Sequence, residues 1–251
     1  MTLRSDRLAD WLRERATAAG ARGFILGMSG GIDSAVVARL CQKAMPDRVL
    51  GVIMPCHSQP SDELDALLAA ETSGLPTVRV DLSSAYDALT LDVTPASVEA
   101  ARHGLPTDPA RARLALANIK PRLRMTTLYT IGTAAGLLVT GTGNRSEITI
   151  GYYTKYGDGG VDLLPIAALV KREVRELARE LDVPARLIDK APTAGLWAGQ
   201  TDEGEMGFTY DDLERFIDAG AESVSTETAA RIQQLIDASH HKRDLPPIGP
   251  R

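Results

Sequence analysis

The segment Ser29–Ser34, with the sequence Ser-Gly-Gly-Ile-Asp-Ser, constrains the fold of this chain more than any other. It lies between an apolar run, 23–28, that is typical of a buried strand, and a run, 35–44, that is typical of a helix. In such a strand–turn–helix unit, glycines let the backbone approach a polyphosphate closely, and the free N–H groups of the first helical turn point at it. The segment therefore predicts a phosphate-binding loop.

Asp33 distinguishes this loop from a Walker A loop, in which a lysine follows the last glycine and neutralises the phosphates. No lysine follows Gly31 in this sequence. Phosphates repel a carboxylate unless a divalent cation lies between them, so Asp33 predicts Mg²⁺ bound together with ATP. An ordinary glycine-rich turn is the alternative interpretation, and the complete six-residue string between a strand and a helix favours the nucleotide site.

The composition predicts a compact intracellular enzyme. With 251 residues, of which 44% are hydrophobic, the chain can bury the core of one domain spanning 1–251. Its net charge of −5 argues against a nucleic-acid partner. Two cysteines are too few for a disulfide framework or a zinc cluster, so both are expected to be reduced thiols. We find neither a signal peptide nor an apolar run that could span a membrane, and we expect a cytoplasmic location.

Strand and helix signals alternate along the chain, which is typical of a parallel sheet with helices on both faces. The predicted strands are 24–28, 49–54, 77–81 and 137–140. The predicted helices are 32–44, 61–73, 83–101, 109–135 with an interruption at Pro121, 169–181, 210–219 and 227–238. Ligands of such doubly wound α/β folds bind at the carboxyl ends of the strands. The segments 29–34 and 141–147 both follow strands, and we expect them to open onto one crevice.

The segment Gly141–Glu147, Gly-Thr-Gly-Asn-Arg-Ser-Glu, also follows a predicted strand and is a second candidate for nucleotide binding. Its glycines and Thr142 can approach a nucleotide, and Glu147 lies in the following helix, where it can meet a metal. Taken alone, the segment is equally well interpreted as a structural turn that caps a helix. Asp33 and Glu147 together predict a two-carboxylate magnesium site.

Two stretches rich in glycine predict functional loops in the second half of the chain. The first, 151–160, is rich in glycine and tyrosine, and the second, 190–207, has no apolar period and is typical of a lid. Lys171 lies near the start of a predicted helix, where a solvated lysine is the ordinary interpretation and a lysine directed at phosphate is the alternative. The basic segment 239–243 is typical of a solvated tail.

Several of these strings resemble a known family. Ser29–Ser34 resembles the pyrophosphate loop of the N-type ATP pyrophosphatases, which many amidating enzymes share. Further strings resemble the NAD synthetase family and occur in its order over nearly the whole chain: 118–125 (Asn-Ile-Lys-Pro-Arg-Leu-Arg-Met), 141–147, 151–158, Asp162, Pro165, Lys171 and 192–202. The resemblance implies a doubly wound, adenine nucleotide alpha-hydrolase-like domain that forms a homodimer, with a dinucleotide site in the dimer interface.

The resemblance also implies roles for individual residues. The implied ATP-binding set is Gly27, Met28, Ser29, Gly30, Gly31, Ile32, Asp33, Ser34, Thr142, Lys171 and Thr193. The implied magnesium ligands are Asp33 and Glu147. The implied residues for nicotinate adenine dinucleotide (deamido-NAD) are Arg122, Lys155, Asp162, His241 and Lys242. Basic side chains suit a dinucleotide with two phosphates, whereas Asp162 is better suited to an amide, a hydroxyl or ammonium.

The implied activity is the ATP-dependent amidation of deamido-NAD to NAD. A carboxylate oxygen attacks the α-phosphorus of ATP and releases pyrophosphate, and ammonia then displaces AMP from the acyl-adenylate. Glutamine-dependent members carry an additional glutaminase domain, for which 1–251 leaves no residues, so free ammonia is the expected nitrogen donor. One residue departs from the pattern: Ile53 stands where some members have an arginine thought to help bind ATP.

Three alternatives remain at this point. Another N-type ATP pyrophosphatase, which amidates a different nucleotide acid or modifies tRNA, would share 29–34 but not the strings within 141–202. A non-catalytic nucleotide-binding protein would not need Asp33, Glu147 and Lys171 together. A purely structural dimer module would be destabilised by two long glycine-rich loops. The strings in the second half of the chain favour the synthetase.

Overall fold

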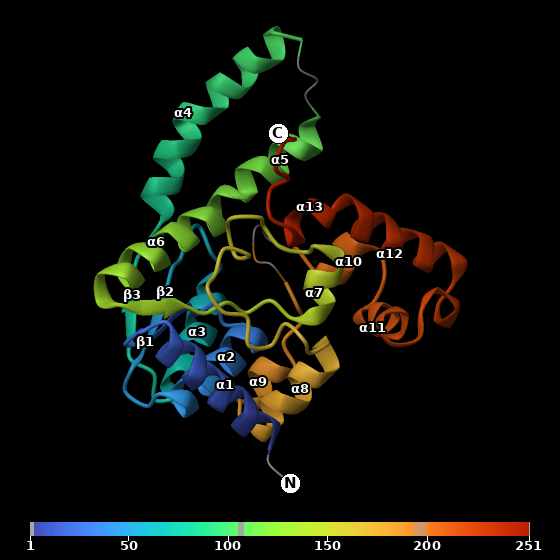
Figure 1. Cartoon of the computed structure of the whole chain (residues 1–251). Helices are drawn as coiled ribbons and strands as arrows, with labels where there is room; N and C mark the ends of the chain where they lie inside the picture. The colour runs from blue at the N-terminus through green and yellow to red at the C-terminus, as the bar shows by residue number, and fades with distance from the viewer. Residues whose placement is uncertain (1–2, 105–107, 194, 196, 198, 251) are drawn as a thin grey trace.

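A sheet of four parallel strands in the order β3–β2–β1–β4 forms the centre of the molecule (Figure 1). The computed structural model describes residues 3–104, 108–193, 195, 197 and 199–250. The strands are β1 Gly23–Gly27, β2 Val49–Ile53, β3 Thr77–Arg79 and β4 Leu137–Val139, within two residues of the predicted bounds. The chain winds outward from β1 through β2 to β3 and then places β4 on the other side of β1. The winding direction therefore reverses between β1 and β4, where folds of this kind bind ligands.

The predicted helices are present, and shorter ones occur between them. The longer helices are α1 Arg4–Ala18, α2 Ile32–Ala44, α3 Pro60–Thr72, α4 Ser83–Arg102, α5 Pro109–Ala117, α6 Ile119–Ala135, α8 Lys171–Glu180, α11 Tyr210–Ala219 and α12 Thr226–Ala238. The shorter ones are α7 Arg145–Ile150, α9 Ala185–Ile188, α10 Asp202–Met206, the 3₁₀ turn η1 Ala221–Ser223 and α13 His240–Arg243. In the described part of the chain, no helix has both the length and the apolar character to cross a membrane.

Both faces of the sheet are covered by helices, as the alternating pattern predicts. Successive side chains of a strand point to opposite faces. Phe24 and Leu26 of β1 accordingly pack into one core with residues of α1, α2, α8 and α9. Ile25, between them, packs into a second core with Val52 of β2 and Leu128 of α6. The predicted doubly wound α/β fold is confirmed.

The predicted interruption of the helix 109–135 is confirmed, but its position differs from the prediction. Asn118 ends α5 and precedes α6, whereas Pro121 is the third residue of α6. The N–H groups of a first helical turn have no partner within the helix, so proline is tolerated there. The chain therefore breaks three residues before the proline.

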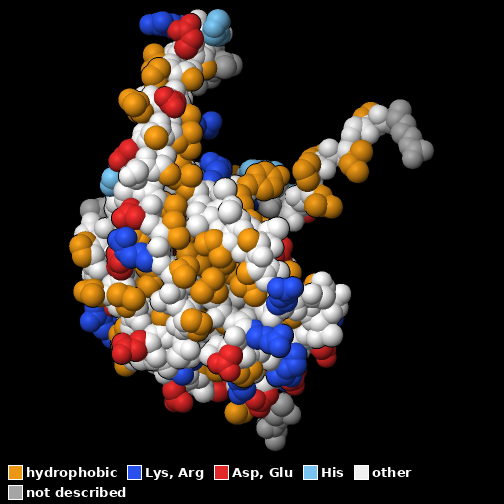
Figure 2. Space-filling view, turned by 90° about the vertical axis from the view of Figure 1, so that its left-hand side faces the viewer, with side chains coloured by type: hydrophobic (Ala, Val, Ile, Leu, Met, Phe, Trp, Pro, Cys, Tyr) orange, Lys and Arg blue, Asp and Glu red, His pale blue; other side chains and the backbone are white. Residues whose placement is uncertain are grey.

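Helix α4 projects from the body of the molecule, and α5 leads the chain back (Figure 1). Within the described structure, α4 has no buried residue, although it carries Leu89, Leu91 and Val98 as exposed apolar side chains. Figure 2 shows hydrophobic side chains along this helix and over the surface at its base.

The carboxyl-terminal helices form a smaller unit beside α7. Tyr210 and Leu213 of α11 and Ile232 of α12 pack with Ile150 of α7 in a third hydrophobic cluster. The segment 239–243 is not the solvated tail that its charge predicts. It contains α13, and the Lys242 Nζ donates hydrogen bonds of 2.7 Å to two carbonyl oxygens of the 151–160 loop.

Candidate active site

The loop after β1 is folded as a compact turn. The hydroxyl oxygens of Ser29 and Ser34 lie 3.0 Å apart, and the Gly31 N–H donates to the Ser29 Oγ at 3.3 Å. Gly30 has φ of +76°, a conformation that favours glycine. In the described structure, no side chain caps the amino end of α2, which begins directly after Gly31. The turn therefore presents the positive end of a helix and two hydroxyl groups, as the predicted phosphate site requires.

The loop after β4 lies beside it, because β4 is the neighbour of β1 in the sheet. The Asn144 Oδ1 accepts a hydrogen bond of 3.0 Å from the Glu147 N–H, and the Glu147 Oε2 accepts one from the Asn144 N–H. This reciprocal capping box fixes the start of α7. It leaves the amide nitrogen of Asn144 directed at Asp33, to whose Oδ1 it donates at 3.0 Å. The two loops therefore lie side by side, as the prediction of a common crevice requires.

Lys171 lies between the two predicted metal ligands. Its Nζ is 2.5 Å from the Asp33 Oδ2 and 3.5 Å from the Glu147 Oε1, and its side chain is only 3% exposed. The ring of Tyr210 lies on another side, with its centroid 5.4 Å from the Nζ. The interpretation of Lys171 as a solvated lysine is therefore wrong, because the start of α8 is packed against this crevice.

The charges of this cluster do not balance, since two carboxylates face one ammonium group. Burial and the nearby Asp33 raise the pKa of Glu147 to about 8, although Lys171 opposes the shift. Burial alone would lower the pKa of Lys171, but Asp33 and Glu147 outweigh burial and raise it. When Glu147 loses its proton the site carries an excess of negative charge, and a bound cation would favour that ionised form.

Asp202 and Tyr210, to which the sequence analysis gave no role in the site, lie on the Lys171 side of the crevice. The Tyr210 hydroxyl donates to the Asp202 Oδ2 at 2.8 Å, and both side chains are buried. Burial raises the pKa of Asp202 above its ordinary value. The Asp202 N–H donates to the carbonyl oxygen of Pro192, which closes the loop between them. A buried aspartate in a polar loop leaves no signal in a single sequence.

The 190–207 segment is a loop in its first part and contains α10 in its second. Thr193 is exposed, and its hydroxyl accepts a hydrogen bond of 3.1 Å from the Gly195 N–H. Trp197 lies under the guanidinium of Arg113 from α5, with 4.7 Å from the Arg113 Cζ to the ring centroid. Residues 194, 196 and 198 of the predicted lid lie outside the described residues.

Four of the five residues predicted for the dinucleotide lie together around the 151–160 loop. An Arg122 guanidinium nitrogen is 3.5 Å from the Lys155 carbonyl oxygen, and the Lys155 Nζ donates to the carbonyl oxygen of His241. The Lys242 Nζ lies over the ring of Tyr153, 5.3 Å from its centroid. The structure therefore gathers basic groups from α6, this loop and α13.

Asp162 follows that loop by two residues and contacts α6 at Tyr129, seven residues after Arg122 on the same helix. Its Oδ1 accepts a hydrogen bond of 2.9 Å from the Tyr129 hydroxyl, and its Oδ2 accepts one of 2.8 Å from the Val139 N–H. Burial and the neighbouring Asp162 raise the pKa of Tyr129 to about 12. An open groove of about 590 Å³ runs along α6 here, lined by Met125, Thr126, Tyr129, Thr130, Thr133 and Ala134.

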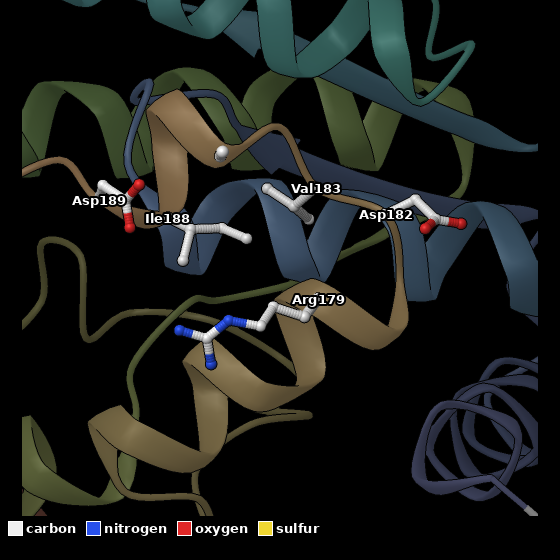
Figure 3. Close-up of a pocket in the computed structure, with 6 residues that line it drawn as sticks. Arg179, Asp182, Val183, Ile188 and Asp189 are labelled. Carbon is white, nitrogen blue, oxygen red and sulfur yellow. The ribbon is translucent and has the colours of Figure 1, made fainter.

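A second depression, of about 450 Å³, lies where α8 leads into α9 (Figure 3). Arg179, Asp182 and Asp189 are the charged residues at its edge, and Val183 and Ile188 are apolar. It contains none of the residues predicted for ATP, magnesium or the dinucleotide. Those residues lie instead along the loops after β1 and β4, around the 151–160 loop and on α13.

The fold and this crevice define the class of protein: a doubly wound α/β enzyme whose phosphate loop lies beside a lysine held by two carboxylates. The model of the NAD synthase family matches residues 4–246. The chain belongs to this family, whose members are ATP-using ligases.

Individual relatives agree with this membership. The NH3-dependent NAD+ synthetase of Carboxydothermus hydrogenoformans is 49% identical over 98% of this chain and 96% of its own. The solved structure of an NMN synthetase from Francisella tularensis has a TM-score of 0.85 at 38% identity, covering 98% of this chain and 96% of that one. The NH3-dependent NAD synthetase of Campylobacter jejuni has a TM-score of 0.77 at 27% identity, with 98% and 97% covered.

Proposed function

We propose that the chain amidates deamido-NAD to NAD, using ATP and ammonia and releasing AMP and pyrophosphate. The observation that carries the proposal is the cluster of Asp33, Lys171 and Glu147 beside the phosphate loop. A buried lysine and two carboxylates at this place suit a reaction in which pyrophosphate leaves ATP. Family membership and the curated relatives support the choice of the acid and of ammonia as the nitrogen donor.

ATP is proposed to lie with its phosphates on the loop after β1. The proposed contacts are the backbone and hydroxyl groups of Gly27, Met28, Ser29, Gly30, Gly31, Ile32, Asp33 and Ser34, together with Thr142, Lys171 and Thr193. Thr142 follows β4 and is only partly exposed, and Thr193 follows α9. The nucleotide would therefore span the β1 loop, the β4 loop and the segment after α9.

Asp33 and Glu147 suit Mg²⁺ because their carboxylates lie close together. Oxygens of the two groups are 2.5 Å and 3.5 Å from the same Lys171 Nζ. In the described structure, no group of three His, Cys, Asp or Glu residues could hold a metal alone. Magnesium commonly takes only one or two carboxylates and completes its six ligands with phosphate oxygens and water. When bound, the ion would neutralise charge on the phosphates of ATP.

The residues of this chain contribute positioning and charge to the two chemical steps. A nicotinate carboxylate oxygen attacks the α-phosphorus while the bond to pyrophosphate breaks, and Lys171 offsets the charge that builds on the leaving group. The N–H groups at the amino end of α2 hold the pyrophosphate. Ammonia then attacks the acyl carbon, AMP leaves, and one proton is released. Neither step requires a nucleophilic side chain.

Deamido-NAD is proposed to be bound by Arg122, Lys155, His241 and Lys242 on one subunit surface and by Asp162 beside the α6 groove. The dinucleotide would then extend along α6 from the basic group to Asp162, and it is proposed to lie between the two subunits of a homodimer. The exposed apolar side chains of α4 and the groove on α6 supply surface for a second copy of the chain. Cys41 and Cys56 are free and buried, which supports a reducing compartment such as the cytoplasm.

A second candidate acid is nicotinate mononucleotide, because the similar solved structure with a TM-score of 0.85 is that of an NMN synthetase. The test is a direct competition: purified protein, Mg-ATP and ammonium with equal concentrations of the two acids, followed by chromatography of the products. We expect NAD to exceed NMN, with AMP formed in equal amount to the amide. Predominant NMN would replace the substrate, and no amide of either kind would contradict the proposed function.

A further inference from the structure

Lys190 connects three parts of the molecule that are far apart in the sequence. It follows α9, at the point where the loop that carries Thr193 begins. Its Nζ donates to the Asp62 Oδ1 at 2.9 Å, to the Asp65 Oδ2 at 2.8 Å and to the carbonyl oxygen of Gly30 at 3.5 Å. The first two contacts are on α3, and the third is on the phosphate loop itself.

The phosphate loop rests directly on the first turns of α3. A methyl group added at Gly30 would come within 2.5 Å of the Asp62 carbonyl oxygen and 2.8 Å of the Asp65 Cβ. Glycine is therefore required at this position for space as well as for its positive φ. Asp62 and Asp65 of α3 therefore pack against the phosphate loop and also bind Lys190.

The contact with the Gly30 carbonyl sets the direction of the next N–H group. In a trans peptide, the C=O and the N–H of one unit point in opposite directions. Because Lys190 binds the oxygen of the Gly30–Gly31 peptide, the Gly31 N–H points away from Lys190 and into the loop, where it reaches the Ser29 Oγ at 3.3 Å. Rotation of this peptide would break the contact with the Ser29 Oγ and so release one of the two hydroxyl groups proposed to face the phosphates.

The charge of Lys190 is already balanced, so its role is geometric. Arg186 binds the same Asp65 carboxylate, at 2.8 Å from its Oδ1, and the two cations offset Asp62 and Asp65. Burial would lower the pKa of Lys190, but hydrogen bonds to Asp65 and Asp62 raise it, so the side chain stays charged. A neutral cluster of this kind adds little long-range attraction for phosphates.

We infer that Lys190 is a positioning residue that fixes the Gly30–Gly31 peptide for binding the phosphates of ATP. The inference rests on the proposed function for the identity of the nucleotide. It concerns a residue outside the sets assigned above to ATP, magnesium and the dinucleotide. Lys190 acts through the loop backbone, and Asp62 and Asp65 are its supports.

Arg186 offers a matched control, because Lys190→Met and Arg186→Met each remove one cation from Asp65, whose side chain is only 5% exposed. Only Lys190→Met frees the Gly30 carbonyl. The measurement is equilibrium binding of Mg-ATP to each full-length variant, together with the KM for ATP, the KM for deamido-NAD and the thermal midpoint. The binding assay needs no acid substrate, so it remains informative if the acid has been misassigned.

We expect Lys190→Met to weaken Mg-ATP binding by about tenfold and to raise the KM for ATP, with the KM for deamido-NAD unchanged, because small displacements of positioning groups have effects of this order. Arg186→Met should lower the thermal midpoint less, because Arg186 is 63% exposed and pairs with Asp65 alone, and it should change ATP binding less than about twofold. Equal ATP binding by the two variants would overturn the inference, as would an equal rise in both KM values of Lys190→Met.

A third variant keeps the inference testable if Lys190→Met does not fold. Asp62→Asn removes one support of Lys190 at a partly exposed position while preserving the shape of the side chain. We expect an intermediate loss of Mg-ATP affinity. Unchanged affinity in Asp62→Asn would count against the inference. If the wild-type protein makes no NAD, the proposed acid is rejected. The positioning role of Lys190 would still stand if Lys190→Met weakens Mg-ATP binding.

Discussion

The side-chain amide of Asn144 donates a hydrogen bond of 3.0 Å to the carboxylate of Asp33, although the two residues are 111 positions apart in the sequence. Asn144 can do so because its other amide atom caps α7 through the Glu147 N–H. One side chain therefore joins the loops after β1 and β4 and places Glu147 opposite Asp33. This contact aligns the two carboxylates that the proposed reaction needs.

Asp33→Asn is expected to reduce NAD formation by about 10²–10³-fold, because it removes one of the two proposed magnesium ligands while preserving side-chain shape. The coupled NAD assay measures the rate, and circular dichroism checks the fold. Asp10→Asn is the control, since the Asp10 carboxylate pairs with Arg13 on the exposed surface of α1. Near-normal turnover of Asp33→Asn would refute the assigned metal role.

Lys171→Met should lower the free energy of unfolding by about 3 kcal/mol without magnesium, because it leaves two carboxylates facing each other in a buried site. Lys43→Met, which removes a lysine that pairs with Asp6 at 37% exposure, should cost less than about 1 kcal/mol. Denaturant titrations compare the two variants.

Added Mg²⁺ should restore more stability to Lys171→Met than to the wild type, because the ion replaces the missing positive charge between Asp33 and Glu147. Equal losses in Lys171→Met and Lys43→Met, or an identical response to magnesium in Lys171→Met and the wild type, would contradict the electrostatic description of the site.

Comparing Gly30→Ala with Gly74→Ala distinguishes two costs of adding a methyl group: the overlap with neighbouring atoms and the strain of a positive φ. Both glycines have positive φ, but an added methyl group at Gly74 meets nothing within 4 Å, whereas at Gly30 it overlaps α3. Gly74→Ala should therefore cost about 1 kcal/mol of stability and leave activity unchanged. Gly30→Ala should cost more and weaken Mg-ATP binding, which calorimetry measures. Equal effects would show that the loop does not rest on α3.

Helix α4 should mediate self-association. A double substitution, Leu91→Glu with Val98→Glu, places charges on its exposed apolar side chains, of which Leu91 is 75% exposed. We expect the pair to convert a dimer to a monomer in analytical ultracentrifugation and to reduce deamido-NAD binding. Leu64→Glu on α3, an equally apolar and exposed position, should leave the dimer intact. A monomeric wild type would reject the interface.

Much of the fold follows from local patterns in the sequence. The buried run 23–28 and the turn after it identify β1, the phosphate loop and α2, because a buried parallel strand and a glycine-rich helix start both leave local signals. The capping box of Asn144 and Glu147 is similarly local. Asp33 and Glu147 could therefore be selected without a structure.

Other features depend on contacts between distant segments. Lys171 looks like a surface residue in sequence, and only the packing of α8 against the crevice buries it. Lys190, Asp62 and Asp65 meet because α9 and α3 are neighbours of α2, a relationship that no local pattern records. The contact of Asp162 with Tyr129 of α6 likewise follows from the course of the chain after β4.

The most direct test of the proposed chemistry is the fate of the carboxylate oxygen. Deamido-NAD with both carboxylate oxygens as ¹⁸O is incubated with the protein, Mg-ATP and ammonium, and the products are analysed by mass spectrometry. Attack on the α-phosphorus predicts one ¹⁸O atom in each AMP, one in the amide of NAD, and none in pyrophosphate. Unlabelled AMP, or label in inorganic phosphate, would contradict the acyl-adenylate route and the assignment of the crevice to it.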